Sequence, residues 1–379
     1  MTWANDGPEA VSIEGRAERD VPSPPRLVGI GSVEQRVQEV DGELTRRPTN
    51  GISWVQRLRS AVSFGIGAGM LALAVFVLHR WAANVSMAEL ANELAELTTT
   101  QILLATLFSL LSFAALTGYE WYGVRFIGRQ LPVHSVALIS FCTQSVAHAV
   151  GFAIFVGATI RYKLYAYHHF TLLEVAKIQL FFTTTFGLGC LTLVGGTLLI
   201  EPGPLVAATD IPGYVWRSGG SGLLMVVGAV LVWGTWFHRP LRVGGNSILL
   251  PSARVVLAQI VLGVADLGFV ALALHVLLPG SLGLDYFQTL GIFVAALTLG
   301  LISHVPGSLG VFESAVLVLT APEPEQVAAV IGALIAFRAV YYILPLLIGA
   351  GLFGFVELRR VLGMAGGPVV PISRRPGLP

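Results

Sequence analysis

Three charged residues lie in long apolar regions of the sequence, where they could do chemistry inside a membrane. Asp266 and Arg338 lie well inside apolar runs, and Glu313 follows Pro306 and Gly307. A charge that faces lipid at the centre of a spanning helix costs about 2.5–3.5 kcal/mol. Each residue therefore either belongs to an ion pair that locks helices together, or lines a polar cavity for a charged headgroup or a coupled proton. We expect Arg338 and Glu313 in the interior, on elements that meet at the Pro-Gly break.

A cluster of basic and aromatic residues forms a second candidate site. Arg161, Tyr162, Lys163 and Tyr165 follow directly on an apolar run. The planar guanidinium fork of arginine suits phosphate, and tyrosine supplies hydroxyl groups at the depth of lipid headgroups. The same residues could instead form only a positive-inside anchor with interfacial aromatic side chains.

Two histidines stand at interruptions of apolar runs. One interruption reads His148-Ala-Val-Gly151 and the other reads His304-Val-Pro306-Gly307. Broken helices at membrane depth are tolerated where their backbone lines a cavity or is buried in protein. The histidines either cap these breaks or carry a proton. The shared His-x-x-Gly pattern either marks an inverted repeat, as in many transporters, or is a chance match.

The amino-acid composition indicates the class of protein that holds these residues. Hydrophobic residues make up 54% of the 379 residues and charged residues only 12%, with a mean hydropathy of +0.75. An average soluble domain has about 25% charged residues. The formal net charge of +1 argues against a nucleic-acid partner. Cys142 and Cys190 lie in apolar runs, without the spacing of a disulfide framework or a metal site. We therefore expect an all-α polytopic membrane protein without cofactor or metal.

Apolar runs of about 20 residues are long enough to cross a bilayer as helices. The run at 133–160 is interrupted, and basic residues lie near both of its ends. Because Lys and Arg concentrate in cytoplasmic loops, both ends of this run are expected on the cytoplasmic side, as in a re-entrant hairpin. A second re-entrant or broken element is expected at 304–318. The sequence thus predicts about 7–8 spanning helices plus two re-entrant or broken elements. The apolar runs are 61–78, 101–121, 133–160, 175–200, 222–237, 255–278, 286–304, 311–320 and 327–356.

The two ends of the chain are expected to be tails. Residues 1–50 are rich in Pro, Glu, Asp and Arg and contain no apolar run, which predicts a disordered segment and not a signal peptide. Residues 51–360 form the predicted transmembrane domain, and 361–379 a second disordered tail. The pattern of loop charges places both tails in the cytoplasm.

Several catalytic signatures are missing from the sequence. It contains no Walker A motif, no His-Glu-x-x-His and no Gly-x-Ser-x-Gly. Because no nucleophile–base pair is evident either, we expect that the protein is not an enzyme.

Three segments resemble signatures of a known family. The segment from Gly151 to Tyr165, the segment from Val305 to Glu313, and Arg338 with the tyrosines that follow it resemble the lysylphosphatidylglycerol synthase transmembrane region. This family includes the flippase half of the multiple-peptide-resistance proteins and stand-alone flippase-like membrane proteins. The resemblance covers roughly residues 54–360 in order, with Ser308 where the family often has glycine.

The resemblance implies that the protein moves phospholipid, particularly aminoacylated phosphatidylglycerol, between the leaflets of a bacterial plasma membrane. Arg161 and Arg338 would hold the lipid phosphate, and Asp266 and Glu313 would balance charge or accept a cationic headgroup. Only 19 residues follow Arg360, which leaves no room for the soluble aminoacyl-transferase domain of the bifunctional members. This departure argues against a lysyl-lipid substrate unless the synthetase is a separate chain. The alternative is a non-catalytic membrane scaffold or partner subunit for a separate lipid-modifying or envelope enzyme. The expected partners are a second copy of the chain or such an enzyme. The predicted substrate-binding residues are His148, Gly151, Arg161, Tyr162, Lys163, Tyr165, Asp266, His304, Pro306, Gly307, Gly310, Glu313, Arg338 and Tyr342.

Overall fold

The described part of the chain is almost entirely helical. The computed structural model describes residues 76, 86–150, 153–236, 241–243, 246–248 and 252–361. The tail at 1–50, nearly all of the predicted span 61–78, residue Gly151 and the tail beyond Val361 lie outside the described residues. The prediction of an all-α polytopic membrane protein is confirmed.

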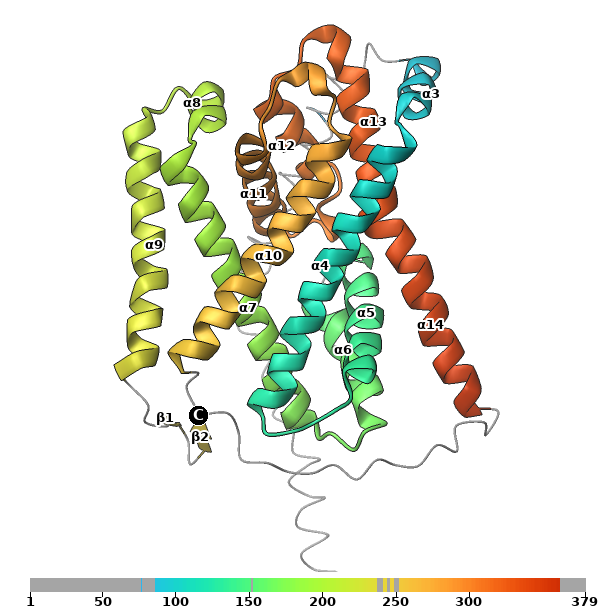
Figure 1. Cartoon of the computed structure of the whole chain (residues 1–379), viewed down its shortest axis with the longest axis vertical. Coiled ribbons are helices and arrows are strands. Elements are labelled where there is room, and N and C mark those ends of the chain that lie inside the picture. The colour runs from blue at the N-terminus through green and yellow to red at the C-terminus, as the bar shows by residue number, and fades with distance from the viewer. Residues whose placement is uncertain are drawn as a thin grey trace, which may run out of the picture. The chain divides into compact units, whose positions relative to one another are not determined.

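The elements follow one another as a series of helices with one short hairpin of strands (Figure 1). Two of the short turns, η2 (Pro306–Ser308) and η4 (Ala339–Ile343), contribute residues to the cavity described below. The helices are α3 (Met87–Glu96), α4 (Thr99–Phe126), α5 (Val133–Val150), α6 (Ala153–Ala166), α7 (Leu172–Ile200), α8 (Gly203–Thr209), α9 (Gly213–Trp236), α10 (Ala253–Leu277), α11 (Tyr286–Ser303), α12 (Val311–Thr320), α13 (Val327–Arg338) and α14 (Leu344–Val361). The strands are β1 (Leu241–Val243) and β2 (Asn246–Ile248), and the turns are η1 (Gly280–Leu282), η2 (Pro306–Ser308), η3 (Pro324–Gln326) and the π-helical turn η4 (Ala339–Ile343).

Six helical segments in the described residues are long and apolar enough to cross a membrane. Polar side chains cap the starts of three of these segments, because the first backbone N–H groups of a helix have no partner within it. The side chains of Thr98, Thr171 and Asp285 accept backbone N–H bonds at the starts of α4, α7 and α11. The six segments are Thr99–Phe126, Leu172–Ile200, Gly213–Gly234, Ala253–Leu277, Tyr286–Ser303 and Pro324–Arg359.

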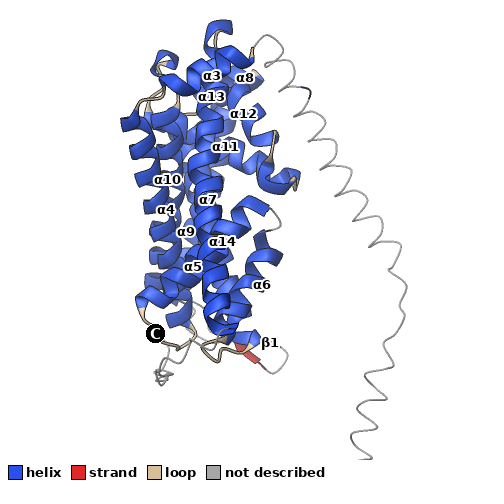
Figure 2. Ribbon diagram, turned by 90° about the vertical axis from the view of Figure 1, so that its right-hand side faces the viewer, coloured by secondary structure: helices blue, strands red, loops and turns tan. Residues whose placement is uncertain are grey.

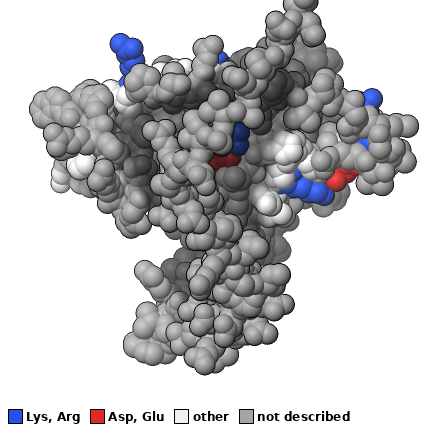
Figure 3. Space-filling model, turned by 90° about the horizontal axis from the view of Figure 1, so that it is seen from below, with Lys and Arg blue, Asp and Glu red and all other residues white. Residues whose placement is uncertain are grey.

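The helix ends fall into two groups of opposite charge, as the alternation of loop charges predicts. The basic end, lower in Figures 1 and 2, carries Arg125, Arg129, Lys163, Lys177, Arg254 and Arg359. Seen from this end, blue Lys and Arg side chains are visible, some with red carboxylates beside them (Figure 3). The acidic end carries Glu89, Glu93, Glu96, Glu201, Asp210, Asp285, Glu323 and Glu325, together with Arg217.

The first re-entrant element is the pair α5 and α6. Helix α4 runs from the acidic end to the basic end, and α7 runs back in the opposite direction (Figure 1). Between them α5 and α6 pack against each other and occupy the half of the bundle nearer the basic end. The chain thus enters and returns on the same side, which confirms the predicted hairpin at 133–160.

The second re-entrant element is the pair α11 and α12, which enters from the acidic end (Figures 1 and 2). Although α11 is long enough to cross, the chain turns back after it. His304, Gly307, Ser308 and Gly310 all have positive φ angles between 52° and 77°. Such angles are strained for residues other than glycine, so His304 and Ser308 hold an unusual backbone conformation here. Helix α12 has ten residues, about 15 Å, and is too short to cross alone.

The two hairpins lie in equivalent places of two inverted units. The first unit is α4, the hairpin α5–α6, and α7; the second is α10, the hairpin α11–α12, and the segment α13–α14. The second unit runs through the bundle in the direction opposite to the first (Figure 1). This arrangement agrees with the inverted-repeat interpretation of the shared His-x-x-Gly pattern.

The two units meet at a close crossing of α7 and α10. A Cβ atom at Gly189 would lie 2.6 Å from the backbone of Gly263, so only glycine permits this approach. One side of the crossing is also tied by a polar contact, because Gln259 donates to the hydroxyl oxygen of Thr185 over 3.0 Å. The crossing holds α10 beside α7, and α10 carries Asp266 toward the centre of the bundle.

Candidate functional site

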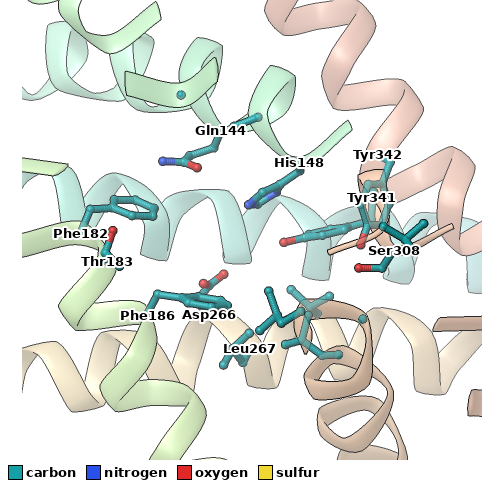
Figure 4. A pocket seen from close by; sticks show the side chains of 18 of the residues that line it. Gln144, His148, Phe182, Thr183, Phe186, Asp266, Leu267, Ser308, Tyr341 and Tyr342 are labelled. Atoms are coloured by element: carbon teal, nitrogen blue, oxygen red, sulfur yellow. The ribbon is translucent and has the colours of Figure 1, made fainter. Parts of the chain in front are cut away.

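A cavity of about 490 Å³ lies between the two hairpins. Residues from α5, α6, α7, α10, α11, the turn after α11 and η4 line it, so both inverted units contribute. Most of the wall is apolar, with Phe182, Phe186, Leu267 and Phe293 among its residues. The polar side chains converge on the same space (Figure 4). The polar lining residues are Gln144, His148, Arg161, Gln179, Thr183, Asp266, His304, Ser308, Tyr341 and Tyr342.

Asp266 is a buried acidic group in the cavity wall, with only 2% of its surface exposed. Figure 4 shows its carboxyl group turned toward the side that carries Gln144 and His148. Ser112 donates to Oδ1 over 2.5 Å, and Tyr119 donates to Oδ2 over 3.0 Å. The Ser112 hydroxyl also lies 3.4 Å from that of Tyr341. The partners of Asp266 among the described residues are thus hydroxyl groups and not cations.

Arg161 and Glu120 form a buried ion pair between α6 and α4. Their exposed fractions are 1% and 0%, and the distance between Nη2 and Oε2 is 2.7 Å. Arg161 Nε donates to Oε1 over 2.9 Å, and Tyr165 donates to the same oxygen over 2.8 Å. Arg161 Nη1 donates to Gln179 of α7. All three guanidinium nitrogens are therefore used within the protein, which fixes the first hairpin to α4 and α7.

Arg338 and Glu313 form a second ion pair, which holds the tip of the other hairpin. Arg338 Nε lies 2.6 Å from Glu313 Oε1. Its Nη1 donates to the carbonyl oxygen of Gly307 over 2.8 Å, and Glu313 Oε2 accepts from the backbone N–H of Gly310 over 2.8 Å. Both residues lie inside the bundle and meet at the Pro306–Gly307 break, which confirms the predicted placement.

An aromatic group closes the cavity on the side of η4. The rings of Phe312, Phe337 and Tyr341 stack in succession at centroid distances of 5.7–5.8 Å, and His148 stacks on Tyr341 at 5.8 Å. The Nδ1 atom of His148 is buried and has no hydrogen-bond partner among the described residues. The π-helical turn brings both Tyr341 and the following tyrosine onto the cavity wall. Such turns often mark functional sites.

The cavity reaches the lateral surface of the bundle. Thr183 on α7 and Leu301 and His304 at the end of α11 line the cavity and are also exposed. These residues lie on spanning segments and at a hairpin tip, away from the basic and acidic ends. The exposed lining residues therefore lie on the side of the bundle, between its two ends.

The described residues do not form an evident metal site. No group of three His, Cys, Asp or Glu side chains there could hold a metal ion. The wall instead offers hydroxyl, amide and imidazole groups, one carboxyl group and the paired guanidinium group of Arg161, within largely apolar surroundings.

Comparison with known proteins shows which family the chain belongs to. The uncharacterized protein slr0712 of Synechocystis sp. is 30% identical over 309 residues, which cover 80% of this chain and 95% of slr0712. The chain belongs to the same family as slr0712. The inner membrane protein YbhN of Escherichia coli strain K12 is 28% identical over 280 residues, or 72% of this chain and 86% of YbhN. No family model matches the chain. With its apolar helices, this member of the slr0712 family is a multi-pass membrane protein.

The structure brings six of the predicted site residues of this slr0712 relative together around the cavity. A second set lies directly behind the wall, in the two ion-pair networks. The lining residues are His148, Arg161, Asp266, His304, Gly307 and Tyr342. Those behind the wall are Tyr165, Gly310, Glu313 and Arg338.

Three predicted residues do not line the cavity. Tyr162 is 43% exposed and Pro306 is also exposed. Lys163 pairs with Glu357 of α14 over 3.2 Å. Neighbouring residues on a helix point about 100° apart, so Tyr162 and Lys163 turn away when Arg161 faces α4. Gly151 lies outside the described residues.

The predicted site residues did not include Glu120, which completes the first ion pair, or the polar wall residues Gln144, Gln179 and Thr183. Glu120 could have been found, because it is an acidic residue within the apolar run at 101–121. It lies near the end of that run, where a charged side chain is expected to reach water, so its position did not indicate a buried site. Helix α4 continues to Phe126, and Glu120 is buried.

Proposed function

We propose that this protein moves phospholipid between the leaflets of the membrane, with the headgroup passing through the cavity between the two hairpins. The supporting observation is the position of this cavity. It lies inside the bundle, has polar groups at its centre and apolar walls, and reaches the lateral surface at Thr183, Leu301 and His304. The resemblance to the lysylphosphatidylglycerol synthase transmembrane region supports the same function, and makes phosphatidylglycerol and its aminoacylated forms the substrates to test.

The inverted hairpins suggest how such movement could occur. Each hairpin enters from one end of the bundle and is pinned by an ion pair to a spanning helix: Arg161 to Glu120, and Glu313 to Arg338. The turn η2 of the second hairpin contacts α5 of the first. In carriers with inverted repeats, movement of one repeat against the other opens a central site to alternate sides. We propose that relative movement of the two units exposes the headgroup first to one leaflet and then to the other.

We further propose that the protein acts without covalent chemistry. The cavity does contain Ser308, His148 and Asp266, the residue types of a hydrolytic triad. However, His148 Nδ1 has no partner among the described residues, and Asp266 accepts its bonds from hydroxyl groups. A catalytic triad needs its histidine oriented by the acidic group and bonded to the nucleophile, and these contacts are not formed.

Blocking the lateral opening tests the proposed function. Thr183→Trp places a large side chain at the mouth of the cavity and is expected to slow translocation of fluorescent phosphatidylglycerol in proteoliposomes strongly. Thr184→Trp is the matched control, because Thr184 is also exposed on the same helix and does not line the cavity. Translocation by the wild-type protein no faster than in protein-free vesicles would refute the proposal. Equal rates for the two variants would place the lipid route elsewhere.

The basic end is proposed to face the cytoplasm, since Lys and Arg concentrate on that side. The connection between α6 and α7 at this end contains His168. In right-side-out vesicles, His168→Cys should resist an impermeant thiol reagent until the membrane is opened, whereas Glu325→Cys at the acidic end should react at once. The reverse labelling pattern would invert the proposed orientation.

A further inference from the structure

Asp266 differs from the other acidic side chains buried beside the cavity. Glu120 and Glu313 each face an arginine at 2.6–2.7 Å. Asp266, by contrast, forms no ion pair with any described residue, and its bonds come from the hydroxyl groups of Ser112 and Tyr119. A buried carboxylate without a cation is strongly unfavourable in an apolar environment, and a bound proton removes its charge.

The other groups around Asp266 do not supply a compensating charge. Tyr119 comes from α4, Cys190 from α7 and Tyr341 from η4, and all three interact electrostatically with Asp266. The same cavity is lined by His148 and His304, whose Nδ1 atoms contact no carboxylate, and by Arg161, which is neutralised by Glu120. Asp266 is therefore the acidic group of the cavity wall whose charge stays unbalanced.

The hydroxyl groups can serve both protonation states of Asp266. A hydroxyl group donates to a carboxylate, but can rotate and accept from a protonated carboxyl group. Ser112 has a second hydroxyl within reach, that of Tyr341 at 3.4 Å, with which it can exchange roles. The network joins α10, α4 and η4 at the cavity. Gain or loss of the proton therefore changes contacts among three elements that surround the proposed substrate route.

We propose that Asp266 is the proton-binding site through which a transmembrane proton gradient drives lipid translocation; this rests on the proposed function. The carboxyl group takes up a proton when the cavity faces the more acidic side and releases it when the cavity faces the other. A proton fits better than Na⁺, because a metal ion needs several oxygen ligands, and the two hydroxyl donors point their hydrogens at the carboxylate. Proton uptake needs no additional ligand.

The experiment measures lipid translocation and proton movement in the same vesicles. Full-length protein is reconstituted in phosphatidylcholine–phosphatidylglycerol vesicles that contain fluorescent phosphatidylglycerol and an entrapped pH dye. Rates are compared at equal pH, with a proton gradient, and with a Na⁺ gradient at equal pH. A gradient of about one pH unit is a tenfold ratio of proton activity, so acceleration of the wild-type protein by up to about tenfold is expected. The dye should report protons crossing together with lipid.

Two variants assign the effect to Asp266. Asp266→Asn keeps an oxygen that accepts from Ser112 and an amide that can donate to Tyr119, so it should fold; its translocation rate should no longer respond to the proton gradient. Asp266→Glu keeps a titratable group and should retain part of the response. A thermal melt of each variant checks folding, and the dye measurement on wild-type protein tests coupling without any substitution.

The outcomes separate this inference from the function on which it rests. Three results for the wild-type protein would overturn the inference and leave lipid translocation standing. The translocation rate would not change with the proton gradient, or it would change with the Na⁺ gradient, or lipid would cross without proton movement. Unchanged gradient response in a folded Asp266→Asn protein would place the proton site elsewhere, and would also overturn it. No translocation under any gradient would overturn both.

Discussion

Replacing Glu120 with glutamine is expected to destabilise the protein by about 3–5 kcal/mol, the usual cost of removing one partner from a buried ion pair. The substitution leaves the charge of Arg161 in the interior, where its exposed fraction is 1%. Gln179 would still accept one bond, and Tyr165 could still donate to the new side chain. Neither contact compensates the charge. The free energy of unfolding in detergent micelles is the measurement.

Two further variants of the protein serve as controls for this prediction. Lys163 lies on α6, as Arg161 does, and pairs with Glu357, but its side chain is 52% exposed. Lys163→Gln removes the cation of this exposed pair. Exposed pairs contribute about 0–1 kcal/mol, so this variant should remain close to wild type. The double variant Glu120→Gln with Arg161→Met removes both buried charges and should recover much of the lost stability. A Glu120→Gln protein as stable as wild type would show that the interior tolerates the unpaired arginine.

The sequence predicted those parts of the fold that depend on local signals. The hairpin at 133–160 followed from basic residues at both of its ends, because loop charge reports the side of the membrane. The turn after α11 followed from Pro306 and Gly307, which cannot continue a helix easily. Asp266 and Arg338 were evident because a charge within an apolar run is rare and costly. In each case a few adjacent residues carried the information.

The rest depended on how helices rotate and pack, which no short segment encodes. Arg161 and Tyr165 are four residues apart, so they share one face of α6 and both reach Glu120. Glu120 is 41 positions from Arg161 in the chain, and the pairing became clear only when α4 and α6 were placed side by side. The arginines predicted to hold phosphate are instead bonded to carboxylates and to protein oxygen atoms. Their phosphate-binding role remains a prediction, and it would require these networks to open.

The second large effect is expected from the double variant Glu313→Gln with Arg338→Gln, which should fold and yet lose translocation. Removing both charges together leaves neither member of this ion pair without its partner, so the melting temperature should stay near that of wild type. The pair also holds the tip of the second hairpin, because Arg338 binds the carbonyl oxygen of Gly307 and Glu313 caps α12 through Gly310. Gly307 and Ser308 line the cavity, so loosening this tip should disturb the lipid route directly.

Translocation by this double variant should fall by roughly tenfold or more, which corresponds to a change of about 1.4 kcal/mol in the transport barrier. The matched control is Arg129→Gln with Glu174→Gln, which removes an ion pair of similar length, 2.7 Å, at the basic end and away from the cavity. That control should transport at the wild-type rate. Both proteins would be measured for lipid translocation in proteoliposomes beside a thermal melt. If the Glu313–Arg338 variant is stable and transports fully, the pair only locks the hairpin to α13. If it is stable and inactive while the control transports, the geometry of this hairpin tip is part of the transport mechanism.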